Sequence, residues 1–213
     1  MTGMIISLTG FMGCGKSSVG RKLSALLSCS YADLDSIIET EAARSIPEIF
    51  AADGEAAFRQ MELDTLKDLV SYQVQPLGCR KKSLPSQAMG PSLCGQRGST
   101  VSDTPAAGPN MLLSLGGGTV MTAECAEIIH TKTLCIYLKA SVDTLVSHLE
   151  GETEGRPMLA SEDSMSSSHA LRRRIKDLMS QRSATYEKTA HIIIDTDGKS
   201  IDSIAEEILN AIH

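Results

Sequence analysis

The segment Gly10–Ser17 reads GFMGCGKS and constrains the fold of this chain more than any other feature of its sequence. It matches the pattern G-x-x-x-x-G-K-[ST], which a chain of this length contains by chance in about one case in a hundred. The apolar run Met4–Thr9 comes directly before it. A strand, a glycine-rich loop and a helix in this order are typical of a P-loop. The helix is indicated by apolar residues at helical spacing, namely Val19, Leu23, Leu26 and Leu27.

The chemistry of a P-loop explains each residue type in the motif. Glycines let the backbone curl so that its N–H groups point at phosphate oxygens, and the N-terminus of the following helix adds partial positive charge. Lys16 then reaches the β- and γ-phosphates of a nucleoside triphosphate, and the Ser17 hydroxyl ligates Mg²⁺. A plain glycine-rich turn is the alternative. The predicted nucleotide-binding residues are Gly13, Cys14, Gly15, Lys16, Ser17 and Ser18.

The rest of the chain alternates between strand-like and helix-like segments. Ser45 and Glu48 form a capping box at the start of one helix, and Gly54 ends it before a second helical stretch at 55–70. Strands separated by helices predict an α/β fold with a parallel sheet covered on both faces. The other predicted strands are 30–34, 111–115, 133–138 and 191–195, and the other predicted helices are 122–130, 141–149, 170–189 and 201–212.

Two segments carry neither pattern. Residues 74–110 contain most of the prolines of the chain, many Gly and Ser, and a basic cluster at 80–82. A structureless loop of this length is uncommon inside a compact domain, so the segment is predicted to be a disordered insertion in a single domain spanning 1–213. Residues 150–168 are polar and acidic, and they are predicted to form a mobile lid loop.

Composition and charge narrow the class of protein. The formal net charge is −6, which gives no reason to expect a nucleic acid or a membrane as partner. No apolar run approaches the roughly 18 residues of a membrane span, and the first residues do not read as a signal peptide. The six cysteines form neither a CxxC pair nor a zinc pattern, so we expect reduced thiols in a cytoplasmic protein.

Asp33 and Asp35 stand at the end of the second predicted strand. Alternation along a strand points both carboxylates to the same side, and the carboxyl ends of parallel strands line the ligand crevice. Two acids at this edge suit the water shell of Mg²⁺ and a hydroxylated phosphate acceptor. An ordinary acidic turn is the alternative.

Further features of the sequence fit contacts to an anionic ligand. The planar fork of Arg59 can grip a carboxylate bidentately, although a surface salt bridge would also explain it. The glycines at 116–118 follow a predicted strand, where they permit close approach by a ligand or simply form a flexible turn. Arg156 lies in the predicted lid, from which a cation can complete a phosphoryl-transfer site, and Arg182 lies on the following helix.

These segments together resemble the shikimate kinase family. They cover nearly the whole chain except 74–110; each is moderately specific, and together they are a strong match. The resemblance implies a nucleoside-monophosphate-kinase-like fold, a three-layer P-loop kinase with a five-stranded parallel sheet. The matching segments, in family order, are GFMGCGKSSVGRKLS, the pair Asp33 and Asp35, SIPEIFAADGEAAFRQMELDTL, LLSLGGGTV, GRPML and QRSATYEKTAHIIIDT.

The resemblance also implies a reaction, the transfer of the γ-phosphate of ATP to the 3-hydroxyl of shikimate with Mg²⁺ as cofactor. Lys16 and Ser17 then belong to the ATP–Mg²⁺ site, with Lys16 acting in catalysis. Asp33 looks like the residue that orients Mg²⁺ through water. Arg156 looks like the lid arginine, which contacts ATP and acts in catalysis.

The acceptor side of the site is implied in the same way. Asp35 looks like the ligand of a shikimate hydroxyl and the catalytic base. Arg59 and Arg182 look like the clamp on the shikimate carboxylate. Gly117 and Gly118 look like backbone contacts to the same substrate.

The chain departs from the family pattern at two places. Many members carry an Arg against adenine seven positions before the lid arginine, and here this position is Leu149, so the adenine contact does not carry over. The second departure is the insertion at 74–110. Another small-molecule P-loop kinase, such as a gluconate kinase, and a non-catalytic regulator with the same fold remain the alternatives. ATP and shikimate are the expected partners of a monomer.

Overall fold

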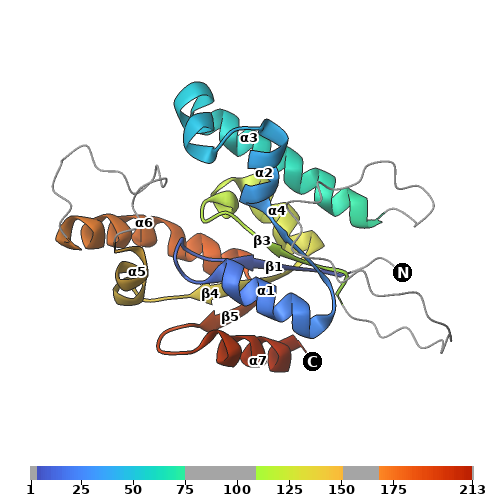
Figure 1. Ribbon diagram of the computed structural model, residues 1–213, viewed down its shortest axis with the longest axis vertical. Helices are drawn as coiled ribbons and strands as arrows, with labels where there is room; N and C mark the ends of the chain where they lie inside the picture. Colours follow the sequence, from blue (N-terminus) through green and yellow to red (C-terminus); the bar gives the residue numbers. More distant parts are fainter. Residues whose placement is uncertain (1–3, 75–108, 151–167, 213) are drawn as a thin grey trace.

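The computed structural model describes residues 4–74, 109–150 and 168–212 (Figure 1). Its centre is a parallel sheet of five strands in the order β2-β3-β1-β4-β5. This confirms the predicted α/β fold with a five-stranded parallel sheet. The strands are β1 (Ile5–Thr9), β2 (Ser30–Asp33), β3 (Met111–Ser114), β4 (Leu134–Lys139) and β5 (Ile192–Asp195).

The sheet is buried on both faces, which explains why its central strands are mainly apolar. β1 and β3 are buried along their full length, whereas the edge strands β2 and β5 are partly exposed. In β1, Ile6 pairs with Leu112 of β3 and with Leu134 of β4. Because successive side chains point to opposite faces, Ile5 belongs to one apolar cluster and Ile6 to the other.

Helices cover both faces of the sheet, as Figure 1 shows. One face carries α1 (Lys16–Leu27) and α7 (Ile201–Ile212), which pack against each other. On the other side lie α2 (Leu34–Ala42), α3 (Ile46–Val74) and α4 (Ala123–Lys132). The remaining elements are a short 3₁₀ helix η1 (Thr119–Met121), α5 (Val142–Leu149) and α6 (Ser168–Thr189).

Most of the predicted helix signals are present in the structure. The Ser45 N–H donates to Glu48 Oε2 at 2.8 Å, as in a capping box, and Ser141 caps α5 by accepting from the Thr144 N–H. Gly54 has φ 81° and ψ 172°, which breaks α3 into two helical parts where the sequence predicted an end. The four apolar residues that indicated α1 are not all in the core, because Leu26 is exposed.

The predicted boundary between the second strand and the next helix is also wrong. β2 ends at Asp33, and Leu34 already begins α2. The cause is the Asp33 side chain, which accepts a hydrogen bond from the Ser36 N–H and so caps the helix. Asp35 therefore lies in the first turn of α2 and not on the strand, so strand alternation does not explain its orientation.

The predicted insertion and lid lie mainly outside the described residues, and Arg156 lies there too. The described ends of these segments are ordered: Val74 ends α3, Ser168 begins α6, and the Asn110 N–H donates to Met4 O at 2.9 Å. No helix in the described ranges is long and apolar enough to cross a membrane.

Candidate active site

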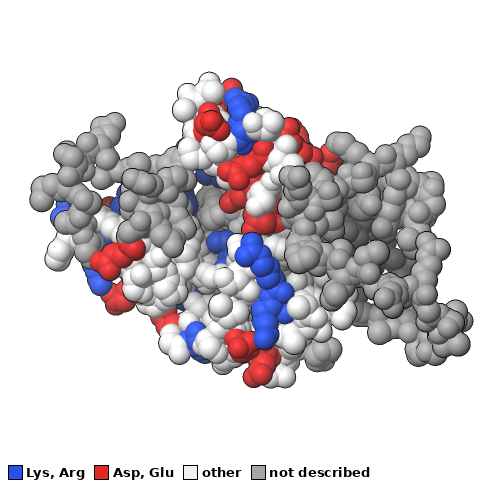
Figure 2. All heavy atoms as spheres, in the orientation of Figure 1, with Lys and Arg blue, Asp and Glu red and all other residues white. Residues whose placement is uncertain are grey.

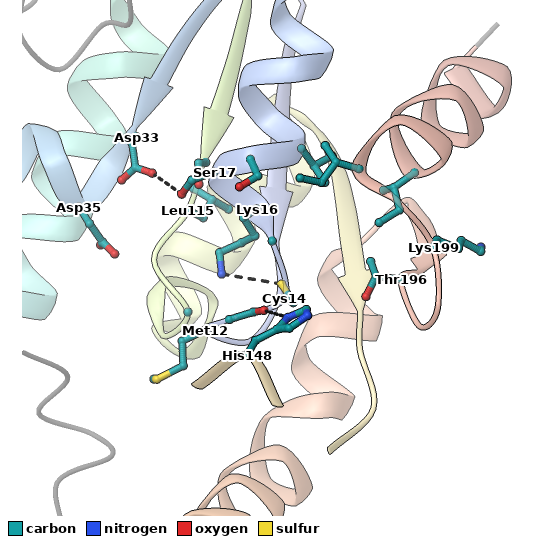
Figure 3. A pocket seen from close by; sticks show the side chains of 18 of the residues that line it. Met12, Cys14, Lys16, Ser17, Asp33, Asp35, Leu115, His148, Thr196 and Lys199 are labelled. Atoms are coloured by element: carbon teal, nitrogen blue, oxygen red, sulfur yellow. Dashed lines mark hydrogen bonds between the residues drawn. The ribbon is translucent and has the colours of Figure 1, made fainter. Parts of the chain in front are cut away.

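A cavity of about 940 Å³ opens at the carboxyl ends of the strands (Figure 3). Ligands bind at this edge in open parallel α/β sheets. The P-loop forms its middle, Asp33 and Asp35 lie at one end, and Thr196 and Lys199 lie at the other. The six P-loop residues predicted to bind nucleotide all line the cavity, as do Asp33, Asp35 and Gly117.

The P-loop has the backbone that its glycines predict. Gly13 and Gly15 have φ values of 82° and 91°, a region that residues with a side chain rarely adopt. Gly15 is the N-cap of α1, so the N-terminus of this helix faces the cavity. A side chain at Gly13 would also approach Leu149 Cγ to 2.9 Å. Leu149 is fully buried, so in this chain the position packs against the P-loop.

Lys16 is held in the centre of the cavity by the backbone of its own loop. Its ammonium group donates to Gly10 O and Phe11 O, each at 3.0 Å, and lies 4.0 Å from Cys14 Sγ. Lys16 forms no ion pair with any other residue in the described ranges. The ammonium charge is therefore oriented and not neutralised by a carboxylate, as a phosphate-binding group requires.

Ser17 and Asp33 bring together oxygen donors suitable for Mg²⁺. The Ser17 hydroxyl donates to Asp33 Oδ2 at 3.2 Å, and the Tyr31 hydroxyl donates to the same oxygen at 3.2 Å. A hydroxyl and a carboxylate from different elements fit a cation that takes few protein ligands and keeps several waters. In the described part of the chain, no group of three or more His, Cys, Asp or Glu residues forms a separate metal site.

Asp35 is the most perturbed carboxyl group that borders the cavity. Burial raises the pKa of Asp35 to about 7; the nearby Asp33 and Glu62 carboxylates act in the same direction, and the Lys16 ammonium opposes them. Among the described residues, Asp35 Oδ1 has no hydrogen-bond partner although it is buried. A Cβ atom at position 116 would stand 2.6 Å from this oxygen, so the absence of a side chain at Gly116 makes space for the Asp35 carboxyl group.

Arg59 reaches the site from α3 in contact with two carboxylates. Its Nη1 donates to Glu62 Oε2 at 2.6 Å, and its Nη2 donates to Glu55 Oε1 at 3.0 Å. Glu62 is completely buried and also accepts from Thr119 Oγ1 at 2.5 Å. Gly118 lies directly under the guanidinium group, because a side chain there would stand 2.6 Å from both terminal nitrogens.

This contact predicts the effect of Gly118→Ala. The backbone at Gly118 has φ −113°, which alanine adopts freely, so the added methyl group causes no backbone strain but displaces the Arg59 guanidinium. We expect the KM for the anionic acceptor to rise at least tenfold and the KM for ATP to change less than about twofold, because a bidentate charge-assisted contact is lost. Steady-state kinetics with each substrate varied in turn measures both values. Equal rises in the two KM values would contradict this role of Gly118.

Arg182 is a buried cation without a counter-ion among the described residues. It is 6% exposed, and its Nη1 lies 3.5 Å from Gly117 O, where the Tyr186 hydroxyl also donates. The ring of Phe11 lies 6.0 Å from the guanidinium carbon. Buried charges in proteins are normally paired, so this guanidinium is a candidate group for binding a ligand anion.

The structure thus places the predicted site residues in two groups. The P-loop residues, Asp33, Asp35 and Gly117 border the cavity, whereas Arg59, Gly118 and Arg182 do not line it and lie around the glycine turn 116–118, next to Asp35. Sequence reasoning missed Glu62 and Tyr186. The spacing of three residues between Arg59 and Glu62 on a helix was the available signal for Glu62.

The opposite end of the cavity is built from α5 and the turn after β5. His148 Nδ1 lies 2.9 Å from Gly13 O, which links the end of α5 to the P-loop (Figure 3). The turn is fixed by Asp197, whose carboxylate accepts from the Ser141 N–H at 2.9 Å and from Thr144 Oγ1 at 2.6 Å. Thr196, Lys199 and His148 line this end, which lies beside the P-loop and away from Asp35.

The sequence of this chain is similar to those of known proteins along most of its length. The family model described as shikimate kinase matches residues 12–77 and 98–213. A shikimate kinase from Chlorobaculum parvum is 34% identical over 209 residues, covering 98% of this chain and 91% of the relative. A shikimate kinase from Dictyoglomus turgidum is 31% identical over 206 residues, covering 96% of this chain and 94% of the relative.

Solved structures are similar to this chain in fold as well. The shikimate kinase from Acinetobacter baumannii in complex with shikimate has a TM-score of 0.75 and 26% identity, covering 99% of this chain and 93% of that one. The shikimate kinase from Bacteroides thetaiotaomicron, at 22% identity and a TM-score of 0.72, shares the fold over 98% of both chains. The match of the family model to most of the chain, together with relatives above 30% identity over nearly its full length, shows that this chain belongs to the shikimate kinase family.

Proposed function

We propose that this chain transfers the γ-phosphoryl group of ATP to the 3-hydroxyl of shikimate, giving shikimate 3-phosphate and ADP. The observation that carries the proposal is the state of Asp35. A carboxyl group with a pKa of about 7 and a buried oxygen without a described partner shares one cavity with the Lys16 ammonium. This combination suits a base that accepts the proton of a hydroxyl beside a bound phosphate.

In this reaction the 3-hydroxyl oxygen forms a bond to the γ-phosphorus while the bond from the γ-phosphorus to the bridging oxygen of ADP breaks. Asp35 Oδ1 accepts the hydroxyl proton. Lys16 and the backbone N–H groups at the start of α1 stabilise the charge that develops on the phosphoryl oxygens. Arg156, which lies outside the described residues, is the proposed second cation of the transfer.

Ser17 and Asp33 are the proposed holders of Mg²⁺, Asp33 through water. When bound with ATP, the ion neutralises phosphate charge and helps to align the transferred group. The Ser17 hydroxyl and the Asp33 carboxylate already lie at hydrogen-bond distance from each other, and this short separation supports a shared cation site.

Arg59 and Arg182 are the proposed clamp for the carboxylate of the acceptor, with Gly117 and Gly118 as backbone contacts. Arg182 supports this assignment most strongly, because burial of its guanidinium without a described counter-ion leaves a positive charge for the ligand to neutralise. Gluconate also carries a carboxylate and hydroxyls, so the clamp alone does not select shikimate. The family assignment favours shikimate.

The test of the proposed function is ADP release by the purified full chain with Mg-ATP. We expect release with shikimate and only background release with gluconate. Background release with shikimate, from protein shown to be folded by circular dichroism, would refute the proposal and favour a non-catalytic regulator.

We further propose that the chain acts as a monomer in the cytoplasm. The free thiols of Cys14, Cys125 and Cys135 fit a reducing compartment. Sizing of the protein in solution tests the assembly state.

The clamp predicts a specific pattern for two conservative substitutions. Arg182→Lys and Arg59→Lys keep the charge but lose the planar fork, so each should raise the shikimate KM about ten- to a hundredfold and leave the ATP KM within about twofold. Arg172→Lys is the matched control, because Arg172 lies on α6 like Arg182 but is exposed and paired with Asp143. We expect neither KM to change in the control. Equal effects of Arg182→Lys on both substrates would argue against a carboxylate clamp.

A further inference from the structure

The Arg59 guanidinium is held by two carboxylates that differ sharply in their surroundings. Glu62 Oε2 accepts from Nη1 at 2.6 Å, and Glu55 Oε1 accepts from Nη2 at 3.0 Å and from Nε at 3.3 Å. All three residues lie on α3, so both contacts are made within two turns of one helix. The single positive charge of Arg59 is therefore shared between two carboxylates, although one would be enough to neutralise it.

Glu62 is a fixed partner. It is 0% exposed, and its second oxygen accepts from Thr119 Oγ1 at 2.5 Å, so both of its oxygens are engaged. Removing it would leave Nη1 of Arg59 without its partner in a largely buried setting, which is unfavourable. Glu62 consequently orients the guanidinium whether or not a ligand is present.

Glu55 is an exchangeable partner. Its side chain is 53% exposed, and a single oxygen serves both the Nη2 and the Nε of Arg59. Exposed ion pairs contribute little to stability, since water solvates the carboxylate almost as well once it moves away. A ligand carboxylate with two oxygens on the same edge makes the stronger, bidentate contact.

The position of Glu55 favours this exchange. Figure 2 shows acidic side chains gathered over α2 and α3, where Glu41, Glu48, Asp53 and Glu55 are all exposed. Arg59 itself is only 17% exposed and lies over Gly118 of the glycine turn. Arg182 lies 3.5 Å from Gly117 O of the same turn and has no counter-ion among the described residues. A carboxylate that bound both arginines would therefore find Arg182 unpaired, but it would have to displace Glu55 from Arg59.

We propose that Glu55 occupies the Nε–Nη2 edge of Arg59 in the free enzyme, and that the carboxylate of the acceptor displaces it on binding. This inference rests on the proposed function, because it takes shikimate as the acceptor. Glu62 keeps Arg59 aligned, and Glu55 competes with the ligand, so that the affinity for the acceptor carboxylate is lower than it would be without Glu55.

The experiment measures shikimate binding to Glu55→Gln by calorimetry and its KM by steady-state kinetics, both with the full chain. Glutamine keeps the size of the side chain and removes the competing charge. We expect the Kd and the KM for shikimate to fall about three- to tenfold, with the ATP KM within about twofold. The carboxamide of shikimate, which lacks the anion, should not gain affinity from the substitution.

Glu48→Gln is the matched control for a general change of charge. Glu48 is another exposed acid on α3, its partner is Ser45, and glutamine also serves in a capping box. We expect this control to leave the shikimate Kd unchanged. Equal tightening in the two variants would overturn the proposal in favour of a long-range charge effect, and unchanged or weaker binding by Glu55→Gln would overturn it outright.

A failure of the inference about Glu55 can be distinguished from a failure of the proposed function. If the unsubstituted chain neither binds nor phosphorylates shikimate, the proposed function fails, and the inference about Glu55 fails with it. If the unsubstituted chain phosphorylates shikimate and Glu55→Gln binds it no more tightly, only the exchange inference fails.

Discussion

Replacing Lys16 with alanine should lower the turnover of this enzyme about a hundred- to a thousandfold while leaving the fold intact. The ammonium group lies in the middle of the cavity, held by Gly10 O and Phe11 O, and forms no described ion pair. Its charge is therefore available for the phosphoryl oxygens, where charge develops during transfer. The loss of one preorganised donor of this kind raises the barrier by about 3–4 kcal/mol.

Lys22→Ala is the control for this prediction. Lys22 lies on the same helix, pairs with Asp202 on the surface and does not border the cavity. We expect its turnover to match the unsubstituted enzyme, and circular dichroism should show both variants folded. A decrease of less than about tenfold for Lys16→Ala, equivalent to about 1.4 kcal/mol, would show that Lys16 does not have the assigned role.

The P-loop half of the site could be predicted from the sequence because its geometry is local. Within one short segment, glycines at Gly13 and Gly15 permit positive φ angles, and the next residues start a helix. The covering of the sheet on both faces could also be predicted, because buried parallel strands are apolar throughout. Neither inference depended on contacts between distant segments.

The half of the site proposed to bind the acceptor depended on such contacts, and its geometry was predicted less well. Asp33 and Asp35 were correctly placed at the carboxyl edge, but for a wrong reason, since Asp33 caps α2 and Asp35 lies on the helix. The burial of Glu62 depends on the packing of α3 against η1, where Thr119 supplies its partner. A glutamate with this spacing from an arginine reads equally well as a surface pair, so the sequence alone does not identify it as buried.

Leu149 shows how a family pattern and a particular chain can differ. The resemblance suggested an arginine against adenine at this position, and the leucine is instead completely buried against Gly13 of the P-loop. The next residue back, His148, faces the cavity from the same end of α5. The packing of α5 against the P-loop buries Leu149 and leaves His148 facing the cavity.

Replacing Asp35 with asparagine should lower turnover about a hundred- to ten-thousandfold, because asparagine cannot accept the hydroxyl proton in the transfer step. The substitution preserves the size of the side chain beside Gly116, where space is limited. We therefore expect the variant to fold and to bind Mg-ATP with little change. A decrease smaller than about tenfold in turnover, with shikimate saturating, would exclude Asp35 as the base.

The same variant should reveal the raised pKa of Asp35 through the pH dependence of the free energy of unfolding. The pKa is about 7 in the folded protein against 3.8 for an ordinary aspartate, so the folded state holds a proton that the unfolded chain has lost. The stabilising contribution of protonated Asp35 is complete below about pH 4 and disappears as the pH rises through 7. The range from pH 5 to the folded pKa of about 7 spans about two pH units, each worth about 1.4 kcal/mol. The free energy of unfolding of the unsubstituted protein should therefore fall by up to about 3 kcal/mol relative to Asp35→Asn between pH 5 and pH 8.

Asp197→Asn gives a control of opposite sign. Hydrogen bonds from Thr144 and Ser141 lower the pKa of Asp197 below its ordinary value, so this carboxyl group is ionised in the folded protein throughout the same pH range. Its replacement should change the free energy of unfolding by a constant amount from pH 5 to pH 8. Urea denaturation of the three proteins at several pH values measures both patterns. If the free energies of the unsubstituted protein and Asp35→Asn stay parallel across the range, the pKa of Asp35 is not raised in the folded protein, and the argument for Asp35 as a base poised near neutral pH fails.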